Sequence, residues 1–312
     1  MSSKISLALG LVFLLFACTP ATQPPENQIV EPITAPTKTP VASTFVPEQP
    51  TKNSVEVDVI ATPTLASNAW MDMPPVPLEV SEHVREIYTL GQSLGNRPYV
   101  FIKIGDSNST TTWFLGPLGR GEYSLGEEYA YLQPAIDAFQ ESFLRNSVAT
   151  WRGFNASAVL SPLWADKDQC ESGESPLNCE MRIMQPAYAL VMLGTNDVSH
   201  IDQFEPKMRE IIQTLLNAGV IPILSTKMDN LEGDNSINAT IAKLAYEYEI
   251  PLWNLWKALE PLDLHGAQPD DEAHLTWAGC HFDDPVAMQS GWPWRNLTAL
   301  QVINKVWQDV KP

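Results

Sequence analysis

The sequence predicts an α/β fold in which a parallel β-sheet lies between two layers of helices, a three-layer α/β/α sandwich. After residue 75, short apolar runs of strand length alternate with longer segments whose apolar residues repeat with a helical period. The run AYALVMLG, residues 187–194, is continuously apolar, as expected of a strand buried on both faces. Strands that alternate with helices form parallel sheets, and functional groups then collect at the carboxyl ends of the strands.

The chain begins with a segment typical of an export signal. Lys4 precedes an apolar run, residues 5–17, which is too short to span a bilayer but has the length of a signal-peptide core. The run leads into Leu-Phe-Ala-Cys, which resembles the lipobox of bacterial lipoproteins, where the cysteine is diacylated and becomes the mature N-terminus. We expect residues 1–18 to be a lipoprotein signal peptide, with Cys18 as the lipidation site of an exported, membrane-anchored protein. A plain secretory signal with an incidental cysteine is the alternative.

Residues 19–74 have the composition of a tether. They are rich in Pro, Thr, Ala, Gln and Val, and contain few aromatic residues. Such a segment cannot bury enough apolar surface to offset its conformational entropy, so we expect it to be disordered. The remainder, residues 75–312, has the size of one α/β domain.

The charge of the chain excludes some partners. The formal net charge is −18 and the isoelectric point is near 4.6. A strongly acidic surface argues against nucleic acid and against docking on anionic lipid, so the membrane contact is expected through the lipid anchor alone. We expect a monomer that acts on a small molecule or a polysaccharide and needs no cofactor.

The elements of the domain can be assigned in order. Ser81 is a helix N-cap, and Gly91 and Gly95 are stop signals for the helix that follows. The next expected elements are a strand at 99–104, a helix at 132–144, a short strand at 147–151, the buried strand at 187–194, a helix at 205–218, the strand VIPILST at 220–226, a helix at 236–248, the strand IPLWNLW at 250–256, and a last helix at 297–310.

The cysteines predict a disulfide. Cys170 and Cys179 bracket a loop that contains Gly, Ser and Pro, and an exported protein folds in an oxidising compartment. A metal site is the alternative, but no histidine lies near these cysteines in the sequence. Cys280 has no obvious mate and is expected to be a lone thiol.

Polar groups follow three of the expected strands. Gly-Asp-Ser ends the first strand, so Ser107 is either part of an ordinary turn or a nucleophile held at the sheet edge. Gly153 follows the second strand, where a glycine lets a ligand approach the backbone closely. Gly-Thr-Asn-Asp ends the third strand and places the Asn196 amide at the same edge, although Asn-Asp is also a common turn and N-cap.

A histidine with a carboxylate three residues before it lies near the C-terminus. In DDEAHLTWAG, Asp271 could accept a hydrogen bond from one imidazole nitrogen of His274, while the other nitrogen deprotonates a hydroxyl. A turn or helix-start pair is the alternative. His200 and His281 lie close to these motifs in the sequence and are candidates only for a supporting role.

Taken in order, GDS, the lone glycine, GTND and DEAHLT resemble the four blocks of the GDSL or SGNH hydrolase superfamily. The resemblance covers roughly residues 98–312. It implies a flavodoxin-like sandwich and ester hydrolysis, with Ser107 as nucleophile, His274 as general base and Asp271 as its orienting carboxylate. It also implies an oxyanion hole formed by the Ser107 N–H, the Gly153 N–H and the Asn196 amide.

Two departures from that pattern leave the substrate open. Asn108 stands where the family usually has Leu or another apolar residue, and an insertion at 280–296 precedes the last helix, where it could narrow the site. Trp277, Trp292 and Trp294 could stack on sugar rings or simply pack the core. The ester could be a carbohydrate acetyl group, a short acyl ester or a lysophospholipid. Acyl transfer with the same residues, and a non-catalytic binding module, are the alternative functions.

Overall fold

The structure is a computed structural model that describes residues 65–311. The expected signal peptide, Cys18 and most of the expected tether therefore lie outside the described residues. The domain begins earlier than residue 75, because the side chain of Trp70 is buried and its carbonyl oxygen accepts a hydrogen bond of 2.7 Å from the Asn254 amide. The tether boundary at residue 74 was thus placed too late. None of the helices among residues 65–311 combines the length and the apolar composition that a membrane span requires.

A parallel sheet of four strands forms the centre of the domain, and the predicted α/β class is confirmed. The strands are β1 (Arg97–Gly105), β3 (Pro186–Met192), β4 (Ile221–Ser225) and β5 (Leu252–Trp253), in the order β1-β3-β4-β5. Every residue of β3 and β4 is buried, as their unbroken apolar sequences predict.

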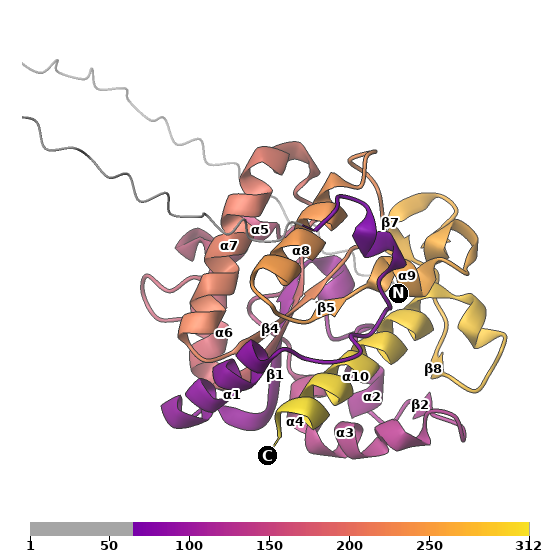
Figure 1. The fold of residues 1–312 in the computed structure, drawn as a ribbon, viewed down its shortest axis with the longest axis horizontal. Helices are drawn as coiled ribbons and strands as arrows, with labels where there is room; N and C mark the ends of the chain where they lie inside the picture. Colours follow the sequence, from indigo (N-terminus) through magenta and orange to yellow (C-terminus); the bar gives the residue numbers. More distant parts are fainter. Residues whose placement is uncertain (1–64, 312) are drawn as a thin grey trace, which may run out of the picture. The chain divides into compact units, whose positions relative to one another are not determined.

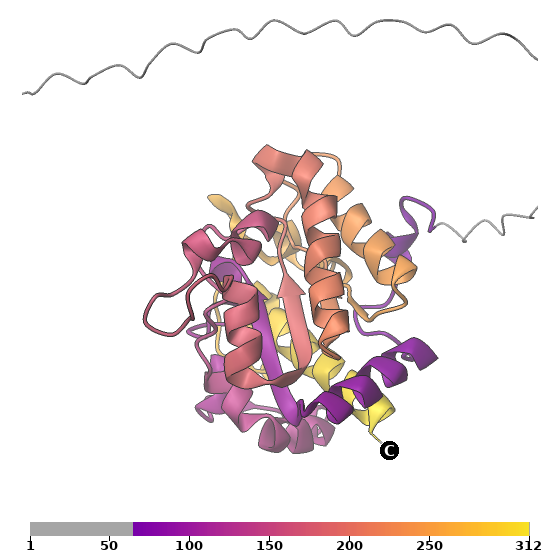
Figure 2. The same ribbon diagram turned by 90° about the vertical axis from the view of Figure 1, so that its left-hand side faces the viewer.

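Helices lie on both faces of this sheet, an arrangement compatible with three layers. On one face, α6 (Pro176–Met184) packs against β1, while α7 (Ile201–Asn217) and α8 (Ser236–Glu247) pack against β4. Figure 2 shows α6 and α7 in front of the strands and α10 (Gly291–Val310) behind them. In Figure 1, α10 runs beside α1 (Glu82–Leu94) and ends at the C-terminus.

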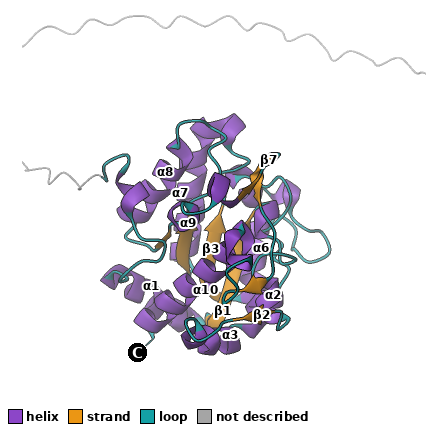
Figure 3. Cartoon of the chain, turned by 90° about the vertical axis from the view of Figure 1, so that its right-hand side faces the viewer, coloured by secondary structure: helices purple, strands orange, loops and turns teal. Residues whose placement is uncertain are grey.

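Short elements complete the fold. Two small sheets pair β2 (Tyr123–Ser124) with β8 (Cys280–His281) and β6 (Ala267–Gln268) with β7 (Asp271–Leu275), and Figure 3 shows β7 apart from the central strands. The short helices are η1 (Ala69–Asp72), η2 (Ser107–Ser109), α2 (Gly116–Gly119), η3 (Ala130–Leu132), α3 (Gln133–Ala138), α4 (Gln140–Leu144), α5 (Ala156–Leu160), η4 (Pro162–Trp164), η5 (Val198–His200), α9 (Leu255–Leu259), η6 (Asp263–Gly266) and η7 (Ala287–Gln289).

Several elements differ from the sequence-based expectation. Helix α1 continues through Gly91 and does not stop there. A Cβ at this position would lie 2.1 Å from the Gly219 carbonyl oxygen, so the glycine is needed for the close approach of the two backbones. The helix expected at 132–144 is broken at Phe139, whose φ of −104° and ψ of 22° are not helical. The strand expected at 147–151 is reduced to a single parallel bridge between Gly105 and Thr150.

The ends of three further elements also differ from the expected ones. Strand β5 is only two residues long, because α9 begins at Leu255. Helix α7 begins at Ile201, four residues before the expected start. Helix α10 begins at Gly291, six residues before the expected start, so part of the expected insertion is helical.

The predicted disulfide between Cys170 and Cys179 is present. Glu174 is the only other metal-ligating side chain grouped with these two cysteines in the described part of the chain. Because metals bind the thiolate and both sulfurs are in the disulfide, this group is not a metal site. Cys280 is a buried free thiol, and burial raises its pKa to about 12.

Candidate active site

Ser107 lies two residues after the end of β1, at the first position of η2. The Asp106 side chain fixes this turn by accepting a hydrogen bond of 2.9 Å from the Asn108 N–H, and the Asp106 carbonyl accepts one of 3.0 Å from the Ser109 N–H. The turn also requires Gly105, because a Cβ there would lie 2.3 Å from the Ser109 hydroxyl oxygen. The Gly-Asp-Ser turn therefore ends the strand and leaves the half-buried Ser107 side chain at the sheet edge.

The structure brings Ser107, His274 and Asp271 into one hydrogen-bonded chain. The Ser107 Oγ lies 3.1 Å from the His274 Nε2, and the His274 Nδ1 lies 2.7 Å from the Asp271 Oδ2. Both partners come from β7, where Asp271 also accepts a hydrogen bond of 3.0 Å from the Ala273 N–H. A proton on Nδ1, held by the carboxylate, leaves Nε2 free to accept the serine proton.

The charge state of Asp271 suits this arrangement. The hydrogen bond from His274 lowers the pKa of the Asp271 carboxyl below its usual value. Asp271 is therefore ionised at neutral pH and acts only as an acceptor. The His274 side chain is 42% exposed, so water can reach the imidazole.

Gly153 lies in the loop that follows residues 147–151, where a strand was expected. Its φ of +77° is a conformation that favours glycine. The neighbouring Gly-Thr-Asn-Asp loop holds it in place: the Asn196 amide donates a hydrogen bond of 3.1 Å to the Phe154 carbonyl, and Asp197 accepts one of 3.0 Å from the Ala156 N–H. The Asn196 amide has a second N–H, which that bond does not use.

The three predicted oxyanion donors come from loops that are joined to one another. The Trp151 N–H donates to the Gly105 carbonyl at 3.2 Å, and the Gly105 N–H donates to the Ala149 carbonyl at 3.1 Å. Within the described part of the chain, neither the Ser107 N–H nor the Gly153 N–H donates a hydrogen bond to a protein group. Both are available to a ligand oxygen at this edge of the sheet.

Two residues of this site were not assigned a role from the sequence. Asn108, which appeared only as a departure from the family pattern, donates a hydrogen bond to the backbone of β7. Arg295 of α10 is buried, and its guanidinium carbon lies 4.9 Å from the centre of the Phe114 ring and 5.4 Å from the centre of the Trp253 ring.

Arg295 and Asp106 are buried charges of opposite sign that act on each other electrostatically. Burial raises the pKa of Asp106 to about 6, and the nearby Arg295 opposes that rise. Burial lowers the pKa of Arg295 to about 10, so the guanidinium stays charged at neutral pH. No sequence signal marked Arg295, since it lies among apolar residues of a helix.

The other residues singled out from the sequence lie differently. His200 and His281 are exposed, and among the described contacts neither forms a hydrogen bond with the Ser107–His274–Asp271 chain. In the insertion at 280–296, Trp292 is buried and the Trp294 indole donates to the Met288 carbonyl, so both are packing residues.

No protein-family model matches the chain, and neither does any curated protein. The arrangement of Ser107, His274, Asp271, Gly153 and Asn196 therefore has to be interpreted from its own geometry. That geometry combines a hydroxyl beside a base with unpaired N–H donors from a neighbouring loop, which is the pattern required for acyl chemistry.

Proposed function

We propose that this protein is a serine ester hydrolase of the SGNH type. The observation that carries the proposal is the hydrogen-bonded chain from Ser107 through His274 to Asp271 at the carboxyl edge of a parallel sheet. The resemblance of the sequence blocks supports the same assignment. A binding module would have no need for a base hydrogen-bonded to this hydroxyl.

In the first half of the reaction, His274 Nε2 removes the Ser107 proton as Oγ attacks the ester carbonyl carbon. The carbonyl oxygen becomes an oxyanion, stabilised by the N–H groups of Ser107, Gly153 and Asn196. The tetrahedral intermediate then collapses: the ester C–O bond breaks, and the leaving alcohol takes the proton from His274. Asp271 stabilises the imidazolium throughout.

In the second half, water replaces the alcohol. His274 deprotonates the water, which attacks the acyl carbon; the bond to Ser107 breaks, and the proton returns to the serine oxygen. The products are a carboxylic acid and the free enzyme. The exposure of His274 admits water and so favours hydrolysis over transfer of the acyl group to another alcohol.

We further propose that the enzyme is exported and anchored to the membrane by lipid on Cys18. The proposal is supported by the apolar run at 5–17 and the Leu-Phe-Ala-Cys sequence that completes it. Two or more acyl chains would make such an anchor stable.

Covalent labelling tests the nucleophile. A fluorophosphonate should modify Ser107 and abolish hydrolysis of p-nitrophenyl acetate, and Ser107→Ala should lose both labelling and turnover with little change in melting temperature. Ser109→Ala is the matched control, since Ser109 lies in the same turn but is fully buried. Labelling that maps to another residue, or an active Ser107→Ala protein, would refute the proposal.

The Asn196 amide gives an independent check. If it stabilises the oxyanion, Asn196→Ala should lower kcat on the order of 10²–10³-fold. If Asn196 only fixes the Phe154 loop, the melting temperature should fall while kcat per folded molecule stays near wild type. The second result would remove Asn196 from the proposed oxyanion hole.

A further inference from the structure

A cavity of about 470 Å³ adjoins the candidate site; we refer to it as the aromatic cleft. Its lining includes Thr110, Asn146, Trp151, Phe154, Trp164 and Asp166. The Thr110 hydroxyl donates a hydrogen bond of 3.0 Å to the carbonyl of Ser107, and Trp151 and Phe154 flank Gly153 in the sequence. A group held in the cleft therefore lies beside both the proposed nucleophile and the proposed oxyanion loop.

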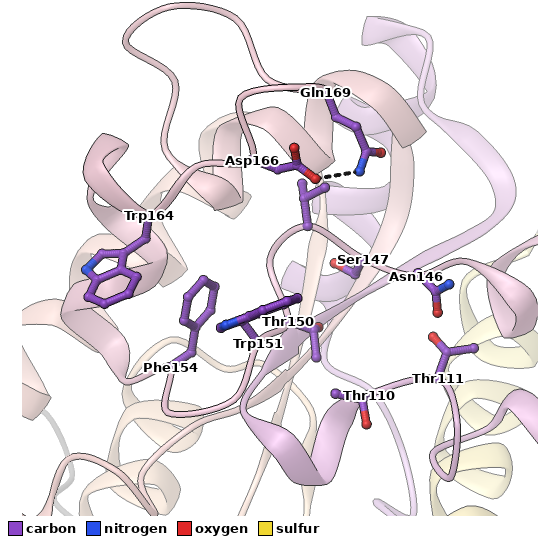
Figure 4. Close-up of a pocket in the computed structure, with 11 residues that line it drawn as sticks. Thr110, Thr111, Asn146, Ser147, Thr150, Trp151, Phe154, Trp164, Asp166 and Gln169 are labelled. Atoms are coloured by element: carbon purple, nitrogen blue, oxygen red, sulfur yellow. Dashed lines mark hydrogen bonds between the residues drawn. The ribbon is translucent and has the colours of Figure 1, made fainter. Parts of the chain in front are cut away.

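Two tryptophans in the cleft present uncovered rings. Trp151 is 64% exposed and Trp164 is 59% exposed, while Phe154 is buried and contacts Trp164 edge-on at 6.3 Å between ring centres. Figure 4 shows the three aromatic side chains together at one end of the cleft. Large aromatic surfaces left in water are unfavourable, so their grouping in a cavity points to a ligand that covers them.

Polar side chains that are hydrogen-bonded to one another form another wall of the cleft. The Gln169 amide donates a hydrogen bond of 2.8 Å to Asp166, and its oxygen accepts from Arg145, which in turn pairs with the buried Glu180 at 2.8 Å. The Cys170–Cys179 disulfide follows directly and fixes the end of this loop. The carboxylate and amide of the wall are thus held in place before any ligand binds.

We infer that the aromatic cleft binds the sugar rings of an O-acylated, neutral polysaccharide. This inference rests on the proposed esterase function. A pyranose has C–H groups on its faces and hydroxyls around its edge. The C–H groups suit the negative face of an aromatic ring, and the hydroxyls suit a carboxylate, amides and threonine hydroxyls.

The composition of the cleft argues against other substrates. A pocket for a long acyl chain would be lined mainly by aliphatic side chains, whereas the apolar lining of this cleft is aromatic and Val148 is its one aliphatic residue. Hydrogen bonds from the Asp168 N–H and from Gln169 lower the pKa of the Asp166 carboxyl, so it is ionised at neutral pH. Together with the net charge of −18, this carboxylate disfavours polyanionic glycans.

A second aromatic cavity offers a further place for sugar rings of the same chain. It has a volume of about 310 Å³ and is lined in part by Trp113 and Trp277, two exposed rings in an edge-on pair at 6.0 Å. It shares no lining residue with the aromatic cleft. Trp277 lies three residues after His274 in the sequence, and Thr110 of the aromatic cleft lies three residues after Ser107. Each cavity is thus lined by a residue close in sequence to one member of the Ser107–His274 pair.

Binding and turnover test this inference separately. Calorimetry with the Ser107→Ala protein should show a lower Kd for a hexasaccharide of xylose, mannose, glucose or N-acetylglucosamine than for the corresponding disaccharide. Trp164→Ala should weaken hexasaccharide binding roughly tenfold, the equivalent of about 1.4 kcal/mol, the size of one aromatic contact. Leu163→Ala is the matched control: this neighbour is exposed but does not line the cleft, and affinity should not change.

In the active protein, acetylated xylan and acetylated glucomannan should be deacetylated with a higher kcat/KM than p-nitrophenyl acetate. Trp164→Ala should reduce the ratio of the two values about tenfold, and Leu163→Ala should leave it unchanged. Absence of binding by all four hexasaccharides at millimolar concentration, or a preference for p-nitrophenyl palmitate or lysophosphatidylcholine, would overturn the inference while leaving the esterase intact. Glycan binding without hydrolysis of any ester would support the cleft and overturn the proposed function.

Discussion

The side-chain amide of Asn108 donates a hydrogen bond of 2.7 Å to the backbone carbonyl of Ala273. Asn108 follows the proposed nucleophile, and Ala273 precedes the proposed base. This bond joins segments that are 165 residues apart in the sequence and sets the position of β7 relative to the Gly-Asp-Ser turn. The amide of Asn108 therefore has a structural role that an apolar side chain at this position could not fill.

Asn108→Ala should lower kcat for p-nitrophenyl acetate and the rate of fluorophosphonate labelling on the order of 10- to 100-fold, with little change in KM, because small misplacements of reacting groups are costly. Asn238→Ala is the matched control. Asn238 is also buried and bonded to backbone, at Lys227, but does not touch the proposed triad segments. A lower melting temperature with unchanged labelling in Asn108→Ala would make Asn108 purely structural.

Asp271→Asn should keep the fold and lower kcat by a factor on the order of 10² to 10⁴, because an amide can hold His274 in the wrong tautomer. Because both side chains are partly exposed, water can replace part of the lost carboxylate interaction. We therefore expect a decrease in kcat near the lower end of this range. Steady-state kinetics at pH 7 measures it. A kcat equal to wild type would remove Asp271 from the proposed triad.

Lys103 should make stability depend on pH above neutrality. Its side chain is buried, donates hydrogen bonds to Thr111 and the Phe143 carbonyl, and burial lowers the pKa of the ammonium to about 7. Between pH 7 and 9 the unfolded state binds this proton and the folded state does not, so the free energy of unfolding should rise with pH.

Lys103→Met should flatten that rise and stabilise the protein most at pH 7 and below, by at most about 5 kcal/mol. Asp106 and Asp197, whose pKa values burial raises to about 6, do not interfere, since above pH 7 both are ionised in either state. Urea unfolding at several pH values measures the slope. Parallel curves for Lys103→Met and wild type would contradict the assignment.

Replacing Cys170 and Cys179 by Ser should cost about 2–3 kcal/mol of stability, because the closed loop is short. It should also loosen the segment with Asp166 and Gln169, so hexasaccharide affinity should fall. Peptide mapping without reductant checks the native pairing, and finding both thiols free would refute it.

Cys18→Ala should release the protein from the membrane fraction, because the proposed anchor is the lipid on this cysteine. Fractionation of cells that express each form, followed by immunoblotting, measures the distribution. A correctly processed Cys18→Ala protein that stays with the membrane would exclude the lipid anchor.

Much of the site could be predicted because it depends on strand ends. Ser107 and Asn196 each follow a buried strand, and parallel strands bring their carboxyl ends to one edge. Asn108 and Arg295 could not be assigned in this way. Their roles depend on contacts with segments far away in the sequence, and neither residue type has a local pattern that marks such a contact.

The errors in the fold have local physical causes. Gly91 was interpreted as a helix stop, but it lies inside the helix, where the absence of a side chain lets the Gly219 backbone come close. Helix α10 starts inside the expected insertion because Gly291 and Pro293 lie in its first turn, where a missing backbone donor costs little. The strand expected at 147–151 lies at the sheet edge and keeps only one bridge, since it turns at once toward Gly153.

Helix α10 is synthesised after every proposed catalytic residue, yet its first turns hold the segment that follows the Gly-Asp-Ser turn. The Leu115 N–H donates a hydrogen bond of 2.6 Å to the Asn296 side chain, whose amide donates one of 3.1 Å to the Trp113 carbonyl. A nascent chain that lacks α10 can contain every proposed catalytic residue and still lack the support for the segment next to its Gly-Asp-Ser turn. Synthesis order alone would thus keep the proposed esterase activity silent until α10 has been made, and chains truncated near residue 290 should be inactive even when Ser107, Asp271 and His274 are intact.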